Sequence, residues 1–452
     1  MSTLAISGAS GFVGMHLLSH LQTKHEVRAL CRGVPPAGVA GVAWQRTELF
    51  SARSTREALR GVDVAYYLVH SMMPSSRLFQ GNFHDTDLLL ADIFAKACVE
   101  NRVRRIIYLG GLVPPTGYVS PHLQSRREVE GVLQASGIPV TVLRAGMIVG
   151  PGGSSFEILQ SLVRKLPVMV LPRWTQSGSQ AVFIDDVATV LARAADDPAF
   201  IGQTFDLVNG ERINYETMLR QMAEALGLRR RMLRVPIASA GFSKLWVQLF
   251  GQASRELVSP LIDSLLCELP QMPPAGPIAP LIRYPTFRGM LAETLTRAAP
   301  ARLMPRRSPP VGHTVRSIQR LPALPARDAS WIAQEYARWL PRFFRPMIKV
   351  RQEGASVEFS TFWLRQPLLV LKAIAADSNA DRVKFHIVGG LLTHTSDTGW
   401  LEFRQVERKA YTLACIHEFV PALPWPVYLW TQAPIHRWTM LAFARHLQSA
   451  RG

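Results

Sequence analysis

Cysteine is scarce in this chain, and its cysteines lie far apart. The 452 residues include four, Cys31, Cys98, Cys267 and Cys415, with no CxxC pair among them. Spacing this wide excludes a finger-type zinc site and a disulfide framework, and it favours reduced thiols. We therefore expect a cytoplasmic protein.

Carboxylates are also few. Asp and Glu number 33 against 51 Lys and Arg, which gives a formal net charge of +18. Such an excess is typical of proteins that meet nucleic acid or an anionic membrane, although an arginine-rich proteome produces it too. No zinc-finger spacing and no aromatic–basic RNA signature is present, so nucleic acid is the less favoured partner. Peripheral contact with a membrane stays open.

Long uninterrupted apolar runs are missing as well. The most apolar late stretch, 419–435, contains four prolines, and this density argues against a membrane-spanning helix. The first predicted strand begins within a few residues of Met1, which leaves no room for a signal peptide. The hydrophobic fraction of 48% is ample for real cores, and the length predicts two or three domains.

A glycine-rich turn stands near the start of the chain. Ser7–Gly14 follows the apolar run Leu4–Ile6 and precedes an amphipathic helical segment. Gly8 can take a positive φ, Gly11 lets a pyrophosphate approach the backbone, and Gly14 lets the helix pack closely. The spacing is GxxGxxG, for which a plain turn is the alternative. We predict a dinucleotide site whose cofactor-binding residues include Gly8, Ala9, Ser10, Gly11, Phe12, Val13 and Gly14.

The residues that follow the next predicted strands indicate whether the cofactor is NAD(H) or NADP(H). An acidic residue after the predicted strand 26–32 would hold the ribose 2′-hydroxyl of NAD, but this chain has Cys31 and Arg32 there. Arg32 could pair with a 2′-phosphate, or it could be a solvated loop arginine. We therefore favour NADP(H) over NAD(H), with Glu48 and Leu49 expected beside the adenine.

Strands and helices alternate through the first part of the chain. Predicted strands 62–70, 106–109 and 140–144 are separated by predicted helices 88–100 and 124–136. This order predicts a doubly wound parallel sheet of the α/β class. Ligands bind at the carboxyl ends of such strands, so Leu68, Val69 and His70 are further candidates. His70 could contact cofactor or substrate, or have no such role.

Several motifs together resemble a known family. SGASGFVG, GVDVAYYLVHS, RRIIYLGG, VTVLRAGMIVGPG and AVFIDDVA are similar to atypical, extended short-chain dehydrogenases/reductases, most of all to their NmrA-like and YbjT-like NAD(P)-binding branch. The resemblance covers residues 1–297. It implies a Rossmann-type fold and a reductase, an epimerase, a redox sensor or a quinone-linked assembly factor.

The catalytic set of that family is not matched. The family uses Ser/Thr after the fifth strand and Tyr-x-x-x-Lys on the next helix, where this chain has Gly110-Gly111, His122 and Arg126. The resemblance implies that His122 acts as the acid and Arg126 holds the ribose in an NADPH-linked reduction of an apolar carbonyl or quinone. A non-catalytic sensor or membrane-surface scaffold is the alternative. His16 and His20 have a metal-ligand spacing but no third ligand, so no metal site is predicted.

The later sequence predicts a second domain. Residues 298–330 are rich in Arg and Pro and read as a linker. Residues 331–452 predict an antiparallel sheet with helices at 331–344, 367–376 and 427–446, and this fragment is expected to fold alone. It resembles a helix-grip, START-like (SRPBCC) module, and GWLEFRQV and APIHRWTMLAFARHL resemble a DUF2867 module. The resemblance implies an apolar small-molecule ligand, with a filled stabilising core as the alternative.

Overall fold

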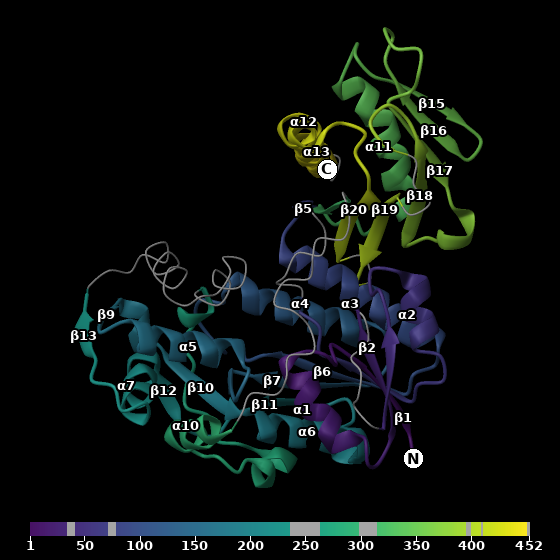
Figure 1. Cartoon of the computed structure of the whole chain (residues 1–452). Helices are drawn as coiled ribbons and strands as arrows, with labels where there is room; N and C mark the ends of the chain where they lie inside the picture. Colours follow the sequence, from purple (N-terminus) through teal and green to yellow (C-terminus); the bar gives the residue numbers. More distant parts are fainter. Residues whose placement is uncertain are drawn as a thin grey trace. The chain divides into compact units, whose positions relative to one another are not determined.

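A computed structural model describes residues 1–33, 41–70, 78–235, 263–297, 314–394, 399–407 and 410–449. The chain divides into two compact units (Figure 1). The first comprises Met1–Met72 and Ile93–Arg306, and the second comprises Met73–Asp92 and Arg307–Gly452. None of the helices that the structure describes is long and apolar enough to cross a membrane.

A seven-stranded sheet organises the first unit. Every neighbouring pair is parallel, so the predicted doubly wound parallel sheet is confirmed. The strand order reverses beside β1, where helices leave towards opposite faces and a crevice opens for a ligand. The order is β11 (Thr204–Leu207), β7 (Val140–Ala145), β6 (Arg105–Gly111), β4 (Val64–Tyr67), β1 (Thr3–Ser7), β2 (Glu26–Cys31) and β3 (Val42–Arg46).

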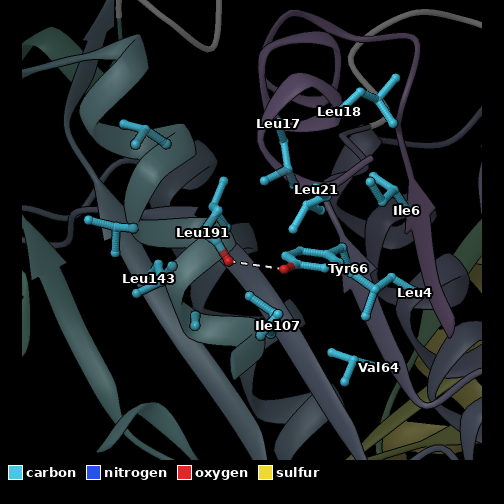
Figure 2. Packing of buried hydrophobic residues seen from close by; sticks show 14 of the residues in the cluster. Leu4, Ile6, Leu17, Leu18, Leu21, Val64, Tyr66, Ile107, Leu143 and Leu191 are labelled. Atoms are coloured by element: carbon cyan, nitrogen blue, oxygen red, sulfur yellow. Dashed lines mark hydrogen bonds between the residues drawn. The ribbon is translucent and has the colours of Figure 1, made fainter. Parts of the chain in front are cut away.

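Helices cover both faces of this sheet. One face carries α1 (Phe12–Leu21) and α6 (Ile184–Asp196), and the other carries α2 (Ala52–Ala58), α4 (Pro121–Ala135) and the second half of α3 (Phe83–Glu100) (Figure 1). Figure 2 shows the first of these interfaces, where leucines of α1 and α6 meet the apolar side chains of β1 and β4. Within it, the Tyr66 hydroxyl donates a 3.0 Å hydrogen bond to the Leu191 carbonyl, which satisfies a polar group in an apolar core (Figure 2).

A second apolar core lies over the carboxyl ends of these strands. It packs around amphipathic α5, whose buried positions Phe156, Leu159 and Leu162 recur at helical spacing. Helix α5 spans Ser154–Lys165, and the elements around it are β8 (Met147–Val149), β9 (Val168–Leu171), β10 (Gly178–Phe183), β12 (Arg212–Asn214), α7 (Tyr215–Ala225), β13 (Arg231–Arg234) and α10 (Phe287–Thr296).

The second unit contains a separate eight-stranded sheet, as the predicted second α+β domain requires. Neighbouring strands are antiparallel except β14 and β5. The order is β15 (Lys349–Glu353), β16 (Ser356–Ser360), β17 (Leu369–Ala373), β18 (Arg382–Gly389), β19 (Trp400–Val406), β20 (Tyr411–Phe419), β14 (Val315–Leu321) and β5 (Leu78–Gln80).

One apolar core joins this sheet to three helices. They are α11 (Ala329–Phe343), α12 (Trp425–Trp430) and α13 (Gln432–Ser449), and their buried side chains share a cluster with alternate residues of the strands. The likeness to helix-grip, SRPBCC and DUF2867 modules stays a prediction.

Two segments fold differently from their predicted form. Residues 315–321, inside the expected linker 298–330, form β14, because Val315, Ile318 and Leu321 are buried while Arg320 pairs with Asp85 at 2.7 Å. The predicted helix 367–376 contains β17 instead. Its leucines favour a helix locally, but pairing with β16 and β18 overrides that preference.

Candidate functional site

The glycine turn has the geometry that a phosphate site needs. Gly8 follows β1 with φ +86°, and the Gly11 amide donates to the Gly8 carbonyl at 3.0 Å. Gly11 is the N-cap of α1, and no described side chain caps this helix. The first-turn amides and the helix dipole therefore favour an anion at this end.

Gly14 and Gly11 have different structural roles. A Cβ on Gly14 would stand 2.4 Å from the Gly8 carbonyl oxygen and 2.6 Å from the Ala9 Cα, so only glycine lets α1 pack on the turn. A Cβ on exposed Gly11 would meet only the Gly8 oxygen, at 3.1 Å. Protein packing therefore constrains Gly11 much less than Gly14, and its role towards a pyrophosphate stays a prediction. The other members of the turn are half-buried Ser10, Phe12 and Val13 and fully buried Ala9.

The ends of β2 and β3 present two exposed arginines. Arg32 follows the end of β2, and Arg46 ends β3 as the register partner of Cys31. Burial raises the pKa of the Cys31 thiol, an effect that the nearby Arg46 charge opposes. Two guanidinium groups at one sheet edge suit a phosphate dianion.

Glu48 and Leu49 lie next along this edge and are half-buried. The Glu48 carboxylate accepts the Phe50 amide at 3.2 Å, and its own amide donates to the Ser54 hydroxyl at 3.1 Å. These bonds stabilise the turn that leads into α2, so Glu48 orders its own loop.

The end of β4 meets the start of α4. The Leu68 amide donates to the Ser7 carbonyl at 3.0 Å, which ties this strand end to the glycine turn. Buried Arg126 donates from Nη1 to the Val69 carbonyl at 3.3 Å. Arg126 therefore joins α4 to the strand end.

The glycines at the end of β6 lie against side chains of α4 and β6. A Cβ on Gly111 would stand 2.8 Å from Leu123 Cδ2 and 3.3 Å from Arg126 Cγ. A larger residue at Gly111 would therefore require the Leu123 side chain to move.

Two histidines form the polar centre of the site. The Nε2 atoms of His70 and His122 are 2.9 Å apart, and the rings are nearly parallel with centroids 4.9 Å apart. His122 Nδ1 lies 3.2 Å from the Ser264 hydroxyl, which lies 3.0 Å from the Ser120 hydroxyl. Hydrogen bonds therefore connect His70, His122, Ser264 and Ser120 in a chain.

Local sequence places His122 at the start of α4. Buried Ser120 caps the helix by accepting the Leu123 amide at 3.2 Å, and Pro121 occupies the first helical position, where no donor is needed. His122 follows at once, so its ring lies beside the end of β4.

An apolar cavity of about 200 Å³ adjoins His122. None of the described residues that line it is Asp, Glu, Lys or Arg, and their polar groups are His122, the Ser264 hydroxyl and a few other neutral side chains. Its wall includes the ends of β6 and β7 at Gly111 and Ala145, and leucines of α5. Such a cavity suits an uncharged, largely apolar molecule.

The far wall supplies two aromatic rings. Trp174 and Tyr215 pack edge to face with centroids 6.0 Å apart, and the Tyr215 hydroxyl donates to Ser179 at 3.3 Å. Burial raises the pKa of Tyr215 to about 12, so this phenol stays protonated at neutral pH. Burial also raises the pKa of the Cys267 thiol, whose sulfur accepts the Ser120 amide.

The structure brings most of the predicted candidates to one edge of the sheet. The glycine turn, Leu68, Val69, His70, His122 and Arg126 are linked through the contacts above. Ser264 was missed, because it lies 142 residues from His122 and no local pattern marks it. Arg46 was also missed, although its place at the end of a neighbouring parallel strand could have revealed it.

Histidines on α1 do not form a recognisable metal site. His16 Nδ1 bonds to the Phe12 carbonyl at 2.9 Å. Among the residues that the structure describes, no group of three or more His, Cys, Asp or Glu could hold a metal ion.

Comparisons with known proteins agree with this geometry. Residues 8–198 match a family model described as NAD(P)H-binding. UDP-glucose 4-epimerase of Vibrio cholerae is 20% identical over 292 residues, covering 59% of this chain and 87% of that protein. The auxiliary protein GraX of Staphylococcus aureus is 23% identical over 108 residues, and that match spans about a third (35%) of its length.

A solved structure shows the same fold. Triphenylmethane reductase of Citrobacter sp., complexed with NADP(H), superposes with a TM-score of 0.51 at 18% identity and covers 64% of this chain and 99% of its own. Residues 8–198 are therefore similar to NAD(P)H-binding domains, and the first unit has the Rossmann-type fold of that reductase.

Proposed function

We propose that this protein uses NADPH to reduce an apolar carbonyl or quinone-type compound. The observation that carries the proposal is the apolar cavity at the strand ends, because His122 stands in its wall and hydrogen-bonds away from it to His70.

The residues of the glycine turn fit the cofactor. Gly11 leaves open the space that a pyrophosphate needs, and Gly8 and Gly14 hold the turn in shape. Arg32, helped by Arg46, would pair with the 2′-phosphate, and this pairing is why we prefer NADP(H) to NAD(H). Glu48 and Leu49 would border the adenine, and Leu68, Val69 and His70 would follow the cofactor towards the cavity.

The cavity supports a particular substrate class. Nucleotide sugars carry a diphosphate, which needs cationic or many polar partners, whereas the described lining has no charged Arg or Lys. A neutral ring system bearing a carbonyl oxygen would pack against Trp174, Tyr215 and the leucines and direct its oxygen to His122 or Ser264.

Side chains of this protein would supply the proton that the reduction needs. When bound, NADPH supplies a hydride, so the reduced carbonyl oxygen needs one proton. His122 can give it directly from Nδ1 or through the Ser264 hydroxyl, which passes on its own proton as it receives another. His70, bonded to Nε2 of His122, is then placed to restore the proton.

A second candidate, a non-catalytic NADP(H)-binding sensor, is favoured by one observation. Arg126 donates to a backbone carbonyl and is buried, so its position serves packing as well as it would serve a ribose. The two candidates share the cofactor and differ in turnover.

The experiment is NADPH oxidation by the full chain with a panel of quinones and enones. We expect turnover with some neutral ring compounds and none with UDP-sugars. Gly11→Val should abolish both NADPH binding and turnover, because a branched side chain fills the phosphate space. Tight NADPH binding with no turnover across the panel would favour the sensor.

We also place the protein in the cytoplasm, since all four cysteines are buried free thiols.

A further inference from the structure

Large apolar side chains lie exposed at one end of the second unit. Trp430 is 86% exposed, and Phe362, Trp363 and Trp438 are each more than half exposed. We name this surface the aromatic face and define it by Phe362, Trp363, Leu364, Leu391, Val427, Trp430, Ile435, Trp438 and Leu441. Soluble proteins rarely expose so many large apolar groups together without a partner.

Hydrogen bonds and ring contacts connect the segments that carry these residues. The Leu391 amide donates to the Pro367 carbonyl at 3.0 Å, which holds the loop of Phe362 and Trp363 beside the turn after β18. Gln432 Nε2 donates to the Leu392 carbonyl at 3.4 Å, which joins that turn to the start of α13. The Trp438 ring lies 4.7 Å from the Phe343 ring, at the end of α11.

Helix α13 contributes a second apolar stripe. Met440, Phe443 and Leu447 face the core, whereas Ile435, Trp438 and Leu441, three residues apart, are exposed. A helix that serves only this core would carry polar residues on its outer side.

Exposed arginines accompany the aromatic face. Arg365 follows Leu364 directly, and Arg437 and Arg445 lie on α13, which also carries Ile435, Trp438 and Leu441. The face therefore combines tryptophans with exposed arginines.

We propose that this face docks on an anionic lipid bilayer. Tryptophan is favoured at the headgroup level, and exposed arginines at the same depth pair with lipid phosphates. A second copy of the chain fits less well, because a symmetric contact would press the exposed arginines of one copy against those of the other. The proposal rests on the second unit alone and is independent of the proposed reaction.

Cosedimentation of the full chain with vesicles tests this docking. Vesicles of equal parts phosphatidylcholine and phosphatidylglycerol should bind the protein, and binding should weaken with added salt. The double variant Trp430→Ser/Trp438→Ser should lose roughly tenfold in partition for each side chain. Arg437→Glu should lose roughly tenfold or more on the anionic vesicles only.

Matched controls come from the first unit. Leu233→Ser removes an apolar side chain that is 54% exposed, and Arg53→Glu reverses an arginine whose side chain is 83% exposed. Both should bind vesicles as the unaltered chain does. The proposal is overturned if the unaltered chain does not bind, if all variants bind equally, or if the double variant instead turns a dimer into a monomer.

Discussion

The two sheets of this protein handle buried charge in opposite ways. The parallel sheet of the first unit is covered by apolar helices, and its polar groups gather at the carboxyl ends of the strands, where His70 and His122 meet. The sheet of the second unit carries its polar groups in mid-strand. There Arg404, 1% exposed, pairs with Asp92 at 2.5 Å and with Glu402.

This difference shows where each sheet can do chemistry. Groups at a strand end face a crevice that a ligand can enter, whereas Arg404, Asp92 and Glu402 are enclosed. The proposed reaction therefore belongs to the first unit, and we expect the network of Arg404 to matter for stability.

Removing His122 is the strongest way to break this comparison. His122→Ala should lower turnover roughly 10²–10⁴-fold at saturating NADPH, because the reduced oxygen loses its proton donor. Steady-state kinetics on a substrate from the quinone and enone panel measures it. Exposed His394 of the second unit is the control, and His394→Ala should leave turnover unchanged.

A loss under about tenfold would show that His122 is not the general acid. That result would favour the non-catalytic sensor. Ser264→Ala sharpens the result, since a relay through the hydroxyl predicts a loss there too, and direct donation from His122 predicts almost none.

Removing Arg404 tests the other side of the comparison. Arg404→Ala leaves two buried carboxylates without their partner and should cost about 3–5 kcal/mol of unfolding free energy. Denaturant unfolding measures it. The control is Arg351→Ala, whose pair with Glu353 is exposed on both sides and should cost at most about 1 kcal/mol.

The apolar replacement Arg404→Met with Asp92→Leu and Glu402→Leu should restore most of the loss. A small effect of Arg404→Ala would contradict a structural role for the network.

Local sequence was enough for the parallel sheet and its glycine turn. Their determinants, such as Gly8, Gly11 and Gly14, lie within a few residues of one another, and the central strands β1, β4 and β6 are mostly apolar. The second unit was harder to predict, because β5 and Asp92 precede the rest of that sheet by over two hundred residues. Strand β14 was assigned to the linker because of its arginines, and Asp85, the partner of Arg320, is equally distant in sequence.

The same distance limits prediction of the site. His122 could be placed from the family pattern, but its partners His70 and Ser264 come from other segments. The same long-range pairing bears on the prediction that fragment 331–452 folds alone. That fragment lacks β14, which pairs with β20.

Half-buried His436, on α13, gives the second unit a specific pH response. Burial lowers the pKa of His436 from 6.5 to about 4, and its Nε2 lies 3.2 Å from the Ser317 hydroxyl. The unfolded chain therefore binds a proton at a higher pH than the folded chain. Its stabilising effect is present above pH 6.5 and declines as the pH falls towards about 4, by about 3 kcal/mol in total.

His436→Gln keeps a hydrogen-bonding side chain and removes the titration. Unfolding free energies of both proteins measured across this pH range should converge at the acid end. A constant difference between the two would contradict the buried neutral histidine.

The smallest expected effect concerns the cofactor's phosphate and returns to the first unit. Losing one charge-assisted phosphate pair costs about 1.5–3 kcal/mol, so Arg32→Ala should lower the ratio of NADPH to NADH affinity roughly ten- to a hundredfold. NADH lacks the phosphate, so its affinity should hardly change, and fluorescence titration with both cofactors gives the ratio. Arg53→Ala on α2 is the control, because that exposed arginine pairs with Glu57.

Arg46 lies on the neighbouring strand and can share the phosphate, so Arg46→Ala should lower the ratio as well. The double variant should lower the ratio more than either single variant. If neither single variant nor the double variant changes the ratio, the two exposed arginines are solvated surface groups and the preference for NADPH fails.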